Sequence, residues 1–108
     1  MLFRSIGTVD LFDFDLHHSR IALGLFVAPG EKGNGFASSA LNIVENYVFN
    51  FLKINQLYCH IAATNIPSIA MFTKRNFESV VLRNWVRTEN GFEDIVVFQQ
   101  FSGASRND

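Results

Sequence analysis

A glycine-rich segment in the first third of the chain constrains the fold more than any other feature. Residues 28–35 read Ala-Pro-Gly-Glu-Lys-Gly-Asn-Gly, a density of helix breakers that only a loop accommodates. Residues 20–27 before it form an apolar run, and after it apolar residues recur at helical spacing. The chain is therefore predicted to pass from a strand through a glycine loop directly into a helix.

Periodicity along the rest of the chain predicts five strands and two helices. A short helix is expected to begin after Asn65 as N-cap, with Pro67 in its first turn, and to end near Asn76 in the left-handed conformation. The strands are expected over residues 7–14, 20–27, 57–63, 80–86 and 95–101. The longer helix would turn these residues toward a sheet: Phe36, Ala40, Ile43, Val44, Tyr47, Val48, Phe51 and Leu52.

Local signals add two details to this order. Gly24 interrupts the strand over residues 20–27 and predicts a bulge or a close backbone approach. Asn90-Gly91 predicts the turn of a closing hairpin. The expected fold class is α/β, with a mixed, mostly antiparallel sheet flanked by helices.

Composition is that of one globular domain. The 108 residues are 48% hydrophobic and 18% charged, which argues against disorder. A net charge of −1 gives no general attraction to nucleic acid or to membranes, so neither is an expected partner. A single cysteine, Cys59, excludes an intrachain disulfide and favours a reducing, cytoplasmic setting. The domain is expected over residues 1–101, followed by a loose polar tail over 102–108.

The junction of the glycine loop and the longer helix suits a ligand that carries phosphate. Glycines let the backbone approach a ligand closely, and a helix N-terminus offers N–H groups and a partial positive charge. Lys32 adds a cation. Taken alone, the loop is equally well explained as a simple chain reversal. It lacks the Gly-Lys-Ser/Thr ending that a nucleoside triphosphate with magnesium requires, so a generic phosphate-loop protein is not favoured.

The loop also resembles the acetyl-CoA signature of the GNAT N-acetyltransferases. That signature is a Gln or Arg, two variable residues, a Gly, one variable residue, and a Gly or Ala. Lys32 stands at its first position, Gly35 at its fourth and Ala37 at its sixth.

Two further segments are similar to the same family, in the same order. Residues 65–78 resemble the segment in which the family writes Asn, then Ser or Ala, then an aromatic residue, and closes on Gly-Phe. The closing hairpin, with Trp85, fits the family's last two strands. The resemblance covers nearly the whole chain and is closest to the branch of spermidine and ribosomal-protein acetyltransferases.

The resemblance implies acetyl-CoA as co-substrate and no metal. The acetyl group would pass to a primary amine, such as a polyamine, another small amine or a protein N-terminus, by direct attack in a ternary complex. The loop backbone would hold the pyrophosphate, the preceding strand would pair with pantetheine, and Lys74 with its neighbour Arg75 would meet the adenosine phosphates. The implied cofactor-binding residues are Phe26, Val27, Lys32, Gly33, Asn34, Gly35, Phe36, Ala37, Asn65, Phe72 and Lys74.

The sequence departs from the family pattern at its front. The family's domain opens with a strand, two helices and a second strand, whereas this sequence begins at what corresponds to the third strand. We expect an intact cofactor half and an incomplete wall of the acceptor site. Apolar surface left uncovered would associate, which predicts a homodimer or a domain-swapped pair.

The family's usual acid–base groups are also replaced. Phe72 stands where many members carry a tyrosine, and Ala22 where related enzymes carry a glutamate. An amine with a pKa near 10 costs about 4 kcal/mol to deprotonate at neutral pH. His60, on the strand over residues 57–63, is the first candidate base, since histidine changes charge in the useful range. Tyr58 is a second candidate, and packing is the alternative role for both residues.

Charged and reactive residues elsewhere have simpler alternatives. Asp10, Asp13 and Asp15 would attract a cationic acceptor such as a polyamine, or they are a solvated hairpin. A metal site at His17-His18 is disfavoured, because adjacent strand residues point to opposite faces. Cys59 has no cation beside it in the sequence, so it is not expected to act as a nucleophile.

These departures from the family pattern are also compatible with a second function. A non-catalytic CoA-binding or interaction domain would explain Phe72, Ala22 and the short front, and it would bind the cofactor without turnover.

Overall fold

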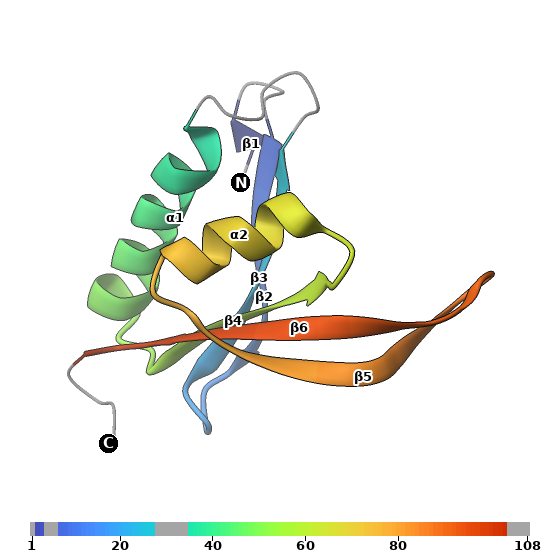
Figure 1. Ribbon diagram of the computed structural model, residues 1–108. Helices are drawn as coiled ribbons and strands as arrows, with labels where there is room; N and C mark the ends of the chain where they lie inside the picture. The colour runs from blue at the N-terminus through green and yellow to red at the C-terminus, as the bar shows by residue number, and fades with distance from the viewer. Residues whose placement is uncertain (1, 4–6, 28–34, 104–108) are drawn as a thin grey trace. The chain divides into compact units, whose positions relative to one another are not determined.

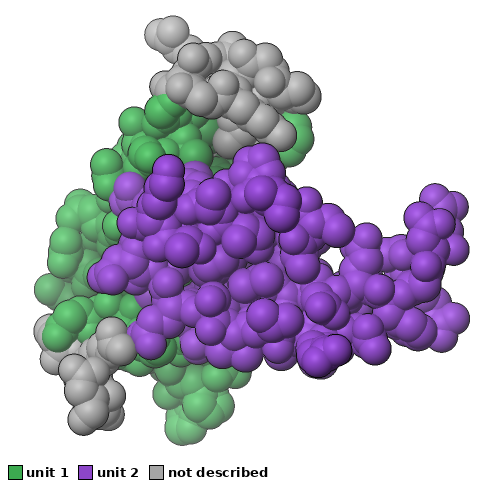
Figure 2. Space-filling view, viewed as in Figure 1, with its two compact units in different colours: residues 1–57, 101–108 green, residues 58–100 purple. Residues whose placement is uncertain are grey.

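The structure is a computed structural model that describes residues 2–3, 7–27 and 35–103. It divides into two compact units, Met1–Leu57 with Phe101–Asp108, and Tyr58–Gln100, coloured green and purple in Figure 2. Lys32, Gly33 and Asn34 of the glycine loop lie outside the described residues. None of the helices in the described residues has the length and hydropathy to span a bilayer.

The first unit is an antiparallel sheet with a helix beside it (Figure 1). Its strands lie in the order β1 (Leu2–Phe3), β2 (Gly7–Asp15), β3 (Arg20–Val27). The helix α1 (Phe36–Asn46) continues directly into a π-helical turn, η2 (Tyr47–Phe51). The predicted strand and helix on either side of the glycine loop are therefore present, and β1 is an additional strand.

Alternation along β2 and β3 explains the core of this unit. Val9 pairs with Leu25, and Leu11 with Leu23, so these four residues share one face of the sheet. The helix contributes residues at three- and four-residue spacing. The buried apolar residues of the unit are Val9, Ile21, Ala22, Leu23, Ala40, Leu41, Val44, Val48, Ile54 and Leu57.

Only part of the predicted apolar face of the longer helix turns inward. Leu41, which the pattern did not place on that face, is fully buried, whereas Phe51, which it did, is 72% exposed. The prediction was wrong because eight residues span more than the roughly 100° stripe that a helix buries on one side. The exposed members of the predicted face include Ile43, Tyr47 and Phe51.

The predicted irregularity at Gly24 lies elsewhere. Gly24 pairs regularly with Asp10, and the register shifts instead between Phe12 and Asp15. Asp13, inside that shift, has a φ of 51°, which an aspartate tolerates better than most residues. What approaches Gly24 is a side chain, since a Cβ there would lie 3.4 Å from Cε1 of Phe12.

The second unit combines a strand, a helix and a long hairpin. β4 (Gln56–Ala62) enters it at Tyr58 and is followed by α2 (Ile66–Lys74). β5 (Glu78–Thr88) and β6 (Gly91–Phe101) are antiparallel, and the strand order is β4-β6-β5. The two-residue turn is formed by Glu89 and Asn90, one residue earlier than Asn90-Gly91. Both strands are longer than predicted.

The limits of α2 agree with the sequence. The side chain of Asn65 accepts a hydrogen bond from Ser68 N at 3.3 Å, as an N-cap does, and Pro67 lies in the first turn. Asn76 has a φ of 69°, in the left-handed conformation that closes many helices. The helix packs through Phe72, which is 1% exposed and stacks on Phe98 of β6.

Candidate functional site

The N-terminus of α1 carries the features that suit an anion. Gly35 precedes the helix with a φ of 78°, and its carbonyl accepts the Ser39 N–H at 3.0 Å. No side chain caps this end, and the first turn holds no acidic residue. Among the described residues, no carboxylate of the first turn therefore offsets the partial positive charge of the helix end. Of the predicted loop residues, Gly35, Phe36 and Ala37 lie in the described part of the chain.

The end of β3 leads to this loop. Phe26 pairs with Thr8 of β2, and Val27 with Gly7, so β2 occupies one edge of β3 at these residues. The other edge of β3 faces β4 in the strand order, so an extended ligand can pair with β3 only at residues that β4 does not pair with. The ring of Phe26 is 58% exposed.

The side-chain oxygen of Asn65 already accepts a hydrogen bond. Its Oδ1 caps α2, and its main-chain carbonyl accepts Ile69 N at 3.0 Å. The Nδ2 group is not part of this cap, and it is a donor that a carbonyl could meet.

Phe72, predicted to bind the cofactor, lies in the core of the second unit instead. Its ring stacks on Phe98 with centroids 5.4 Å apart and meets Phe77 edge-on at 5.1 Å. With 1% of the residue exposed, the side chain cannot reach a ligand without opening the core. This correction follows from packing, because a phenylalanine has no polar atom that would keep it at a polar surface.

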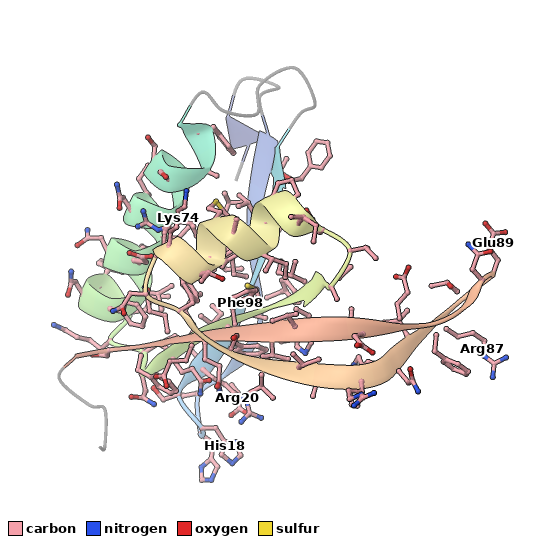
Figure 3. The ribbon with its side chains drawn as sticks, viewed as in Figure 1. His18, Arg20, Lys74, Arg87, Glu89 and Phe98 are labelled. Atoms are coloured by element: carbon pink, nitrogen blue, oxygen red, sulfur yellow. The ribbon has the colours of Figure 1, made fainter. Side chains whose placement is uncertain are left out.

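Lys74 lies at the exposed end of α2, in its last turn (Figure 3). A cation in the last turn complements the negative end of the helix, so the lysine also has a structural role. Its neighbour Arg75 is half-buried, and the Arg75 carbonyl accepts a hydrogen bond from Gln100 Nε2 at 3.1 Å.

The two candidate acid–base residues lie together on one face of β4. The rings of Tyr58 and His60 meet edge-on with centroids 5.9 Å apart. Leu57 and Cys59 alternate with them and are buried, so Tyr58 and His60 share the opposite face. His60 is exposed to solvent.

Cys59 is a buried thiol. Burial raises its pKa to about 12, although a hydrogen bond with the backbone of Phe98 acts in the opposite direction. A thiol with so high a pKa is almost entirely protonated at neutral pH and is a poor nucleophile. The geometry agrees with the prediction that Cys59 carries no acyl group.

The three aspartates of the first hairpin are not equivalent. Asp15 accepts His18 N through Oδ1 at 2.9 Å, and its Oδ2 lies 3.0 Å from His18 Nδ1 and 3.4 Å from a guanidinium nitrogen of Arg20. Hydrogen bonds from the backbone and ring of His18, with the charge of Arg20, lower the pKa of Asp15. Figure 3 shows His18 and Arg20 together at this turn. Sequence reasoning missed Arg20, which follows Asp15 by only five residues.

Asp10 and Asp13 lie apart from that ion pair. Asp13 belongs to the irregular part of the ladder, and Asp10 is exposed on the regular part of β2, opposite Gly24. Residues two apart on a strand share a face, so Phe12 and Phe26 lie on the same face as Asp10. Both rings are exposed, by 48% and 58%.

The described residues bury no polar or charged side chain. Any histidine, tyrosine or carboxylate among them that acts as an acid or a base is therefore at least partly exposed to solvent. In the same part of the chain, no three His, Cys, Asp or Glu side chains gather to hold a metal ion.

Comparison with known proteins identifies the family. The family model for the acetyltransferase (GNAT) domain matches residues 3–78. A spermidine N(1)-acetyltransferase from Vibrio cholerae serotype O1 is 28% identical over 72 residues, covering 67% of this chain and 42% of the relative. An uncharacterized N-acetyltransferase, p20, from Bacillus licheniformis is 27% identical over 94 residues, covering 86% of this chain and 53% of the relative.

Solved structures agree on the fold. A chimera of spermidine N-acetyltransferase SpeG from Vibrio cholerae and hSSAT has a TM-score of 0.84 at 22% identity, covering 92% of this chain and 62% of that one. The spermidine/spermine N-acetyltransferase SpeG from Vibrio cholerae in complex with manganese ions has a TM-score of 0.80 at 23% identity, covering 89% of this chain and 57% of that one.

The chain belongs to the GNAT acetyltransferase family. The resemblance drawn from the loop and from residues 65–78 is thereby confirmed, as is the expected α/β fold class. The chain spans about half the length of the curated relatives it matches.

Proposed function

We propose that the chain binds acetyl-CoA and transfers its acetyl group to a primary amine. The observation that carries the proposal is the start of α1. There Gly35 adopts a left-handed conformation at an uncapped helix N-terminus, inside the segment that the GNAT family matches. Backbone N–H groups at such an end favour a pyrophosphate. Lys32, Gly33 and Asn34, which precede Gly35, would complete the cradle.

The remaining cofactor contacts follow the order of the chain. The main chain of Phe26 and Val27 would pair with pantetheine along the edge of β3 that faces away from β2, at a stretch of that edge where β4 does not pair. Asn65 would donate from Nδ2 to a pantetheine carbonyl while its Oδ1 caps α2. Lys74 would meet the adenosine phosphates from the exposed end of that helix.

A polyamine is the acceptor that the first hairpin favours over other small amines or a protein N-terminus. Asp10 offers a carboxylate beside the exposed rings of Phe12 and Phe26, and such a surface suits an ammonium group on a methylene chain. At Asp15 a cationic acceptor would compete with His18 and Arg20. The name of the relative from Vibrio cholerae, spermidine N(1)-acetyltransferase, points the same way.

The reaction we propose is direct attack within a ternary complex. The amine nitrogen bonds to the thioester carbon, the carbon–sulfur bond breaks, and CoA leaves as its thiolate. The amine must lose its proton, and His60 is the residue we propose to take it. Tyr58, whose ring centroid lies 5.9 Å from that of His60, would donate a proton to the thiolate. Backbone N–H groups near Val27 would stabilise the oxyanion, each worth a few kcal/mol.

A non-catalytic CoA-binding or interaction domain is the second candidate function. It is favoured by Phe72 and Ala22, which stand where the family resemblance places an acid and a base and which are each 1% exposed. Neither residue can transfer a proton. This candidate predicts cofactor binding without turnover.

The setting we propose is cytoplasmic. Cys59 is free, buried and held as a thiol. Reducing compartments keep thiols in this form.

Calorimetric titration with acetyl-CoA, followed by thiol release against polyamines and N-terminal peptides, tests both candidates. Cys59 is buried, so a thiol reagent reports released CoA with little background from the folded protein. Binding with release supports an acetyltransferase and names its acceptor class. Binding without release favours the second candidate, and no binding overturns both. Glu89→Gln, in the turn of the β5–β6 hairpin and outside the proposed cofactor contacts, is the control variant and should behave as wild type.

A further inference from the structure

The side chain of Gln100 joins the last strand of the second unit to the end of α2. Its Nε2 donates a hydrogen bond to the Arg75 carbonyl at 3.1 Å. Arg75 is the C-cap of the helix, and both residues belong to the second unit. Gln100 follows Phe98 by two residues on β6, so it lies on the face of the strand that packs against α2.

The other half of the same amide is not satisfied. Gln100 Oε1 is buried, and no described residue donates a hydrogen bond to it. A buried acceptor without a donor has given up its hydrogen bonds to water, and this loss offsets what one neutral hydrogen bond at Nε2 contributes. A leucine of similar size would leave no polar side-chain atom unpaired there. Core stability therefore does not explain a glutamine at this place.

The Arg75 carbonyl lies where the helix needs a donor. The last carbonyls of an α-helix have no partner within the helix. The Arg75 N–H closes the final turn on the Phe72 carbonyl at 3.2 Å, and Asn76 then turns the chain with a φ of 69°. A donor from β6 fixes the peptide between Arg75 and Asn76, and with it the last turn of α2.

This last turn suits a phosphate only where a cation is held in place. A helix C-terminus carries partial negative charge, which repels an anion. Lys74 is the exposed cation of the turn. The Gln100 amide occupies one of the carbonyl oxygens beside it, which weakens the negative end of the helix and restricts the backbone from which the lysine extends.

We propose that Gln100 is a positioning residue for acetyl-CoA. By holding the Arg75 carbonyl, it directs the last turn of α2 so that Lys74 meets the 3′-phosphate of the adenosine. This inference rests on the proposed function, in which Lys74 contacts the adenosine phosphates, and it names both the phosphate and the residue behind the contact. Gln100 acts through α2 and does not touch the ligand.

Calorimetry with two ligands tests the proposal on the intact chain. Acetyl-CoA carries the 3′-phosphate, and acetyl-dephospho-CoA lacks it. Gln100→Leu should weaken acetyl-CoA binding by about three- to tenfold, the effect of one hydrogen bond, and should leave the affinity for acetyl-dephospho-CoA within about twofold of wild type. Its melting temperature should equal or exceed that of wild type, because the unpaired oxygen is removed.

Two further variants give the matched comparison. Gln99→Leu makes the same substitution at the preceding residue of β6, whose side chain points to the opposite face, and it should bind both ligands as wild type does. Lys74→Met removes the cation itself and should show the same selective loss. Gln100→Leu should cost less affinity when Lys74 is already replaced, since the two residues act through one contact.

Several results would overturn the proposal. An unchanged affinity of Gln100→Leu for acetyl-CoA would show that the end of α2 is set without the amide. Equal weakening for both ligands, with a lower melting temperature, would show that Gln100 has only a structural role. Equal binding of both ligands by wild type would remove the 3′-phosphate contact and leave acetyl-CoA binding intact, whereas binding of neither ligand would contradict the proposed function as well.

Discussion

The aromatic rings of Phe72 and Phe98 stack in the second unit, with 5.4 Å between their centroids and 26° between their planes. The contact joins α2 to β6, and Phe77 closes it edge-on. In the family pattern the position of Phe72 is one where many members carry a tyrosine. Phe72 therefore has a packing role in this chain, and the proposed transfer reaction would need an acid from another residue.

Substitution within this stack should cost stability. Phe98→Ala should lower the free energy of unfolding by about 3–5 kcal/mol, because it leaves a cavity in the core. Phe72→Tyr should cost about 1–3 kcal/mol, since it buries a hydroxyl among apolar rings. Chemical denaturation measures both. Phe92→Ala, at a ring that is 55% exposed, is the control and should change stability by less than about 1 kcal/mol. Equal effects of Phe92→Ala and Phe98→Ala would contradict this description of the core.

Two substitutions at Gly35 separate backbone conformation from space for the ligand. Gly35 has a φ of 78°. Gly35→Val should therefore lower the free energy of unfolding by about 1–2 kcal/mol, whereas Gly35→Asn should hardly change it because asparagine tolerates this conformation. Among the described residues, nothing lies within 4 Å of a Cβ at Gly35, and both side chains would take up space that we assign to the pyrophosphate. Calorimetry should show weaker acetyl-CoA binding in both variants. Wild-type affinity in Gly35→Asn would mean that only the backbone conformation matters.

The proposed base gives a prediction about rate. His60→Gln should lower kcat by about 10²–10⁴-fold without changing acetyl-CoA affinity. Tyr58→Phe keeps the ring beside His60 but removes the hydroxyl, and it should lower kcat less. His17→Gln, at the exposed β2–β3 turn, serves as control. Unchanged kcat in His60→Gln would exclude His60 as the base.

The lowered pKa of Asp15 predicts that part of the folding stability is lost in acid. Because hydrogen bonds from His18 and the charge of Arg20 lower its pKa below 3.8, the folded state favours the carboxylate. The associated stability is present above that value and is lost as pH falls through the lowered pKa. Asp15→Asn keeps a carbonyl for His18 N but removes the charge. Its melting temperature should therefore lie below that of wild type at pH 6 and converge with it toward pH 2. A constant difference at all pH values would rule out the carboxylate charge as the cause.

The burial of Cys59 predicts that its thiol reacts with thiol reagents only when the chain unfolds. With a pKa of about 12 and 2% exposure, it should react with a disulfide reagent at pH 8 far more slowly than a free thiol. In guanidinium chloride one thiol per chain should react at once. Rapid reaction of the native protein would show that the core around Cys59 opens easily.

The order of strands and helices could be predicted from the sequence because each element has a clear period or a clear stop. Asn65, Pro67 and Asn76 define the limits of α2 through local chemistry alone. The bounds of the closing hairpin are harder to predict, because its outer residues are exposed on both faces and show no alternation of polar and apolar residues. Its turn nevertheless lies within one residue of the predicted Asn-Gly pair.

Which face of a helix is buried could not be predicted from spacing alone. Leu41 and Ile43 both fit a helical period, and only the sheet decides between them. The same limit applies to the candidate site. The motifs near Gly35 and Asn65 could be recognised in the sequence. The ion pair of Asp15 with Arg20 could not, because it depends on the register of the hairpin, which brings the two residues opposite each other. Phe72 could be matched to the family pattern, but its burial depends on Phe98, more than twenty residues away.

The outer half of the β5–β6 hairpin can accept changes of sequence without loss of stability. Arg87 lies 4.8 Å from the ring centroid of Phe92, and Thr88 closes the turn through its hydroxyl, but the outer residues add almost nothing to either buried core. Insertions and replacements at Glu89 and Asn90 are therefore tolerated with little thermodynamic penalty. Over evolutionary time such a tip can drift freely, and in the laboratory it is a suitable place for a fluorophore or an affinity tag.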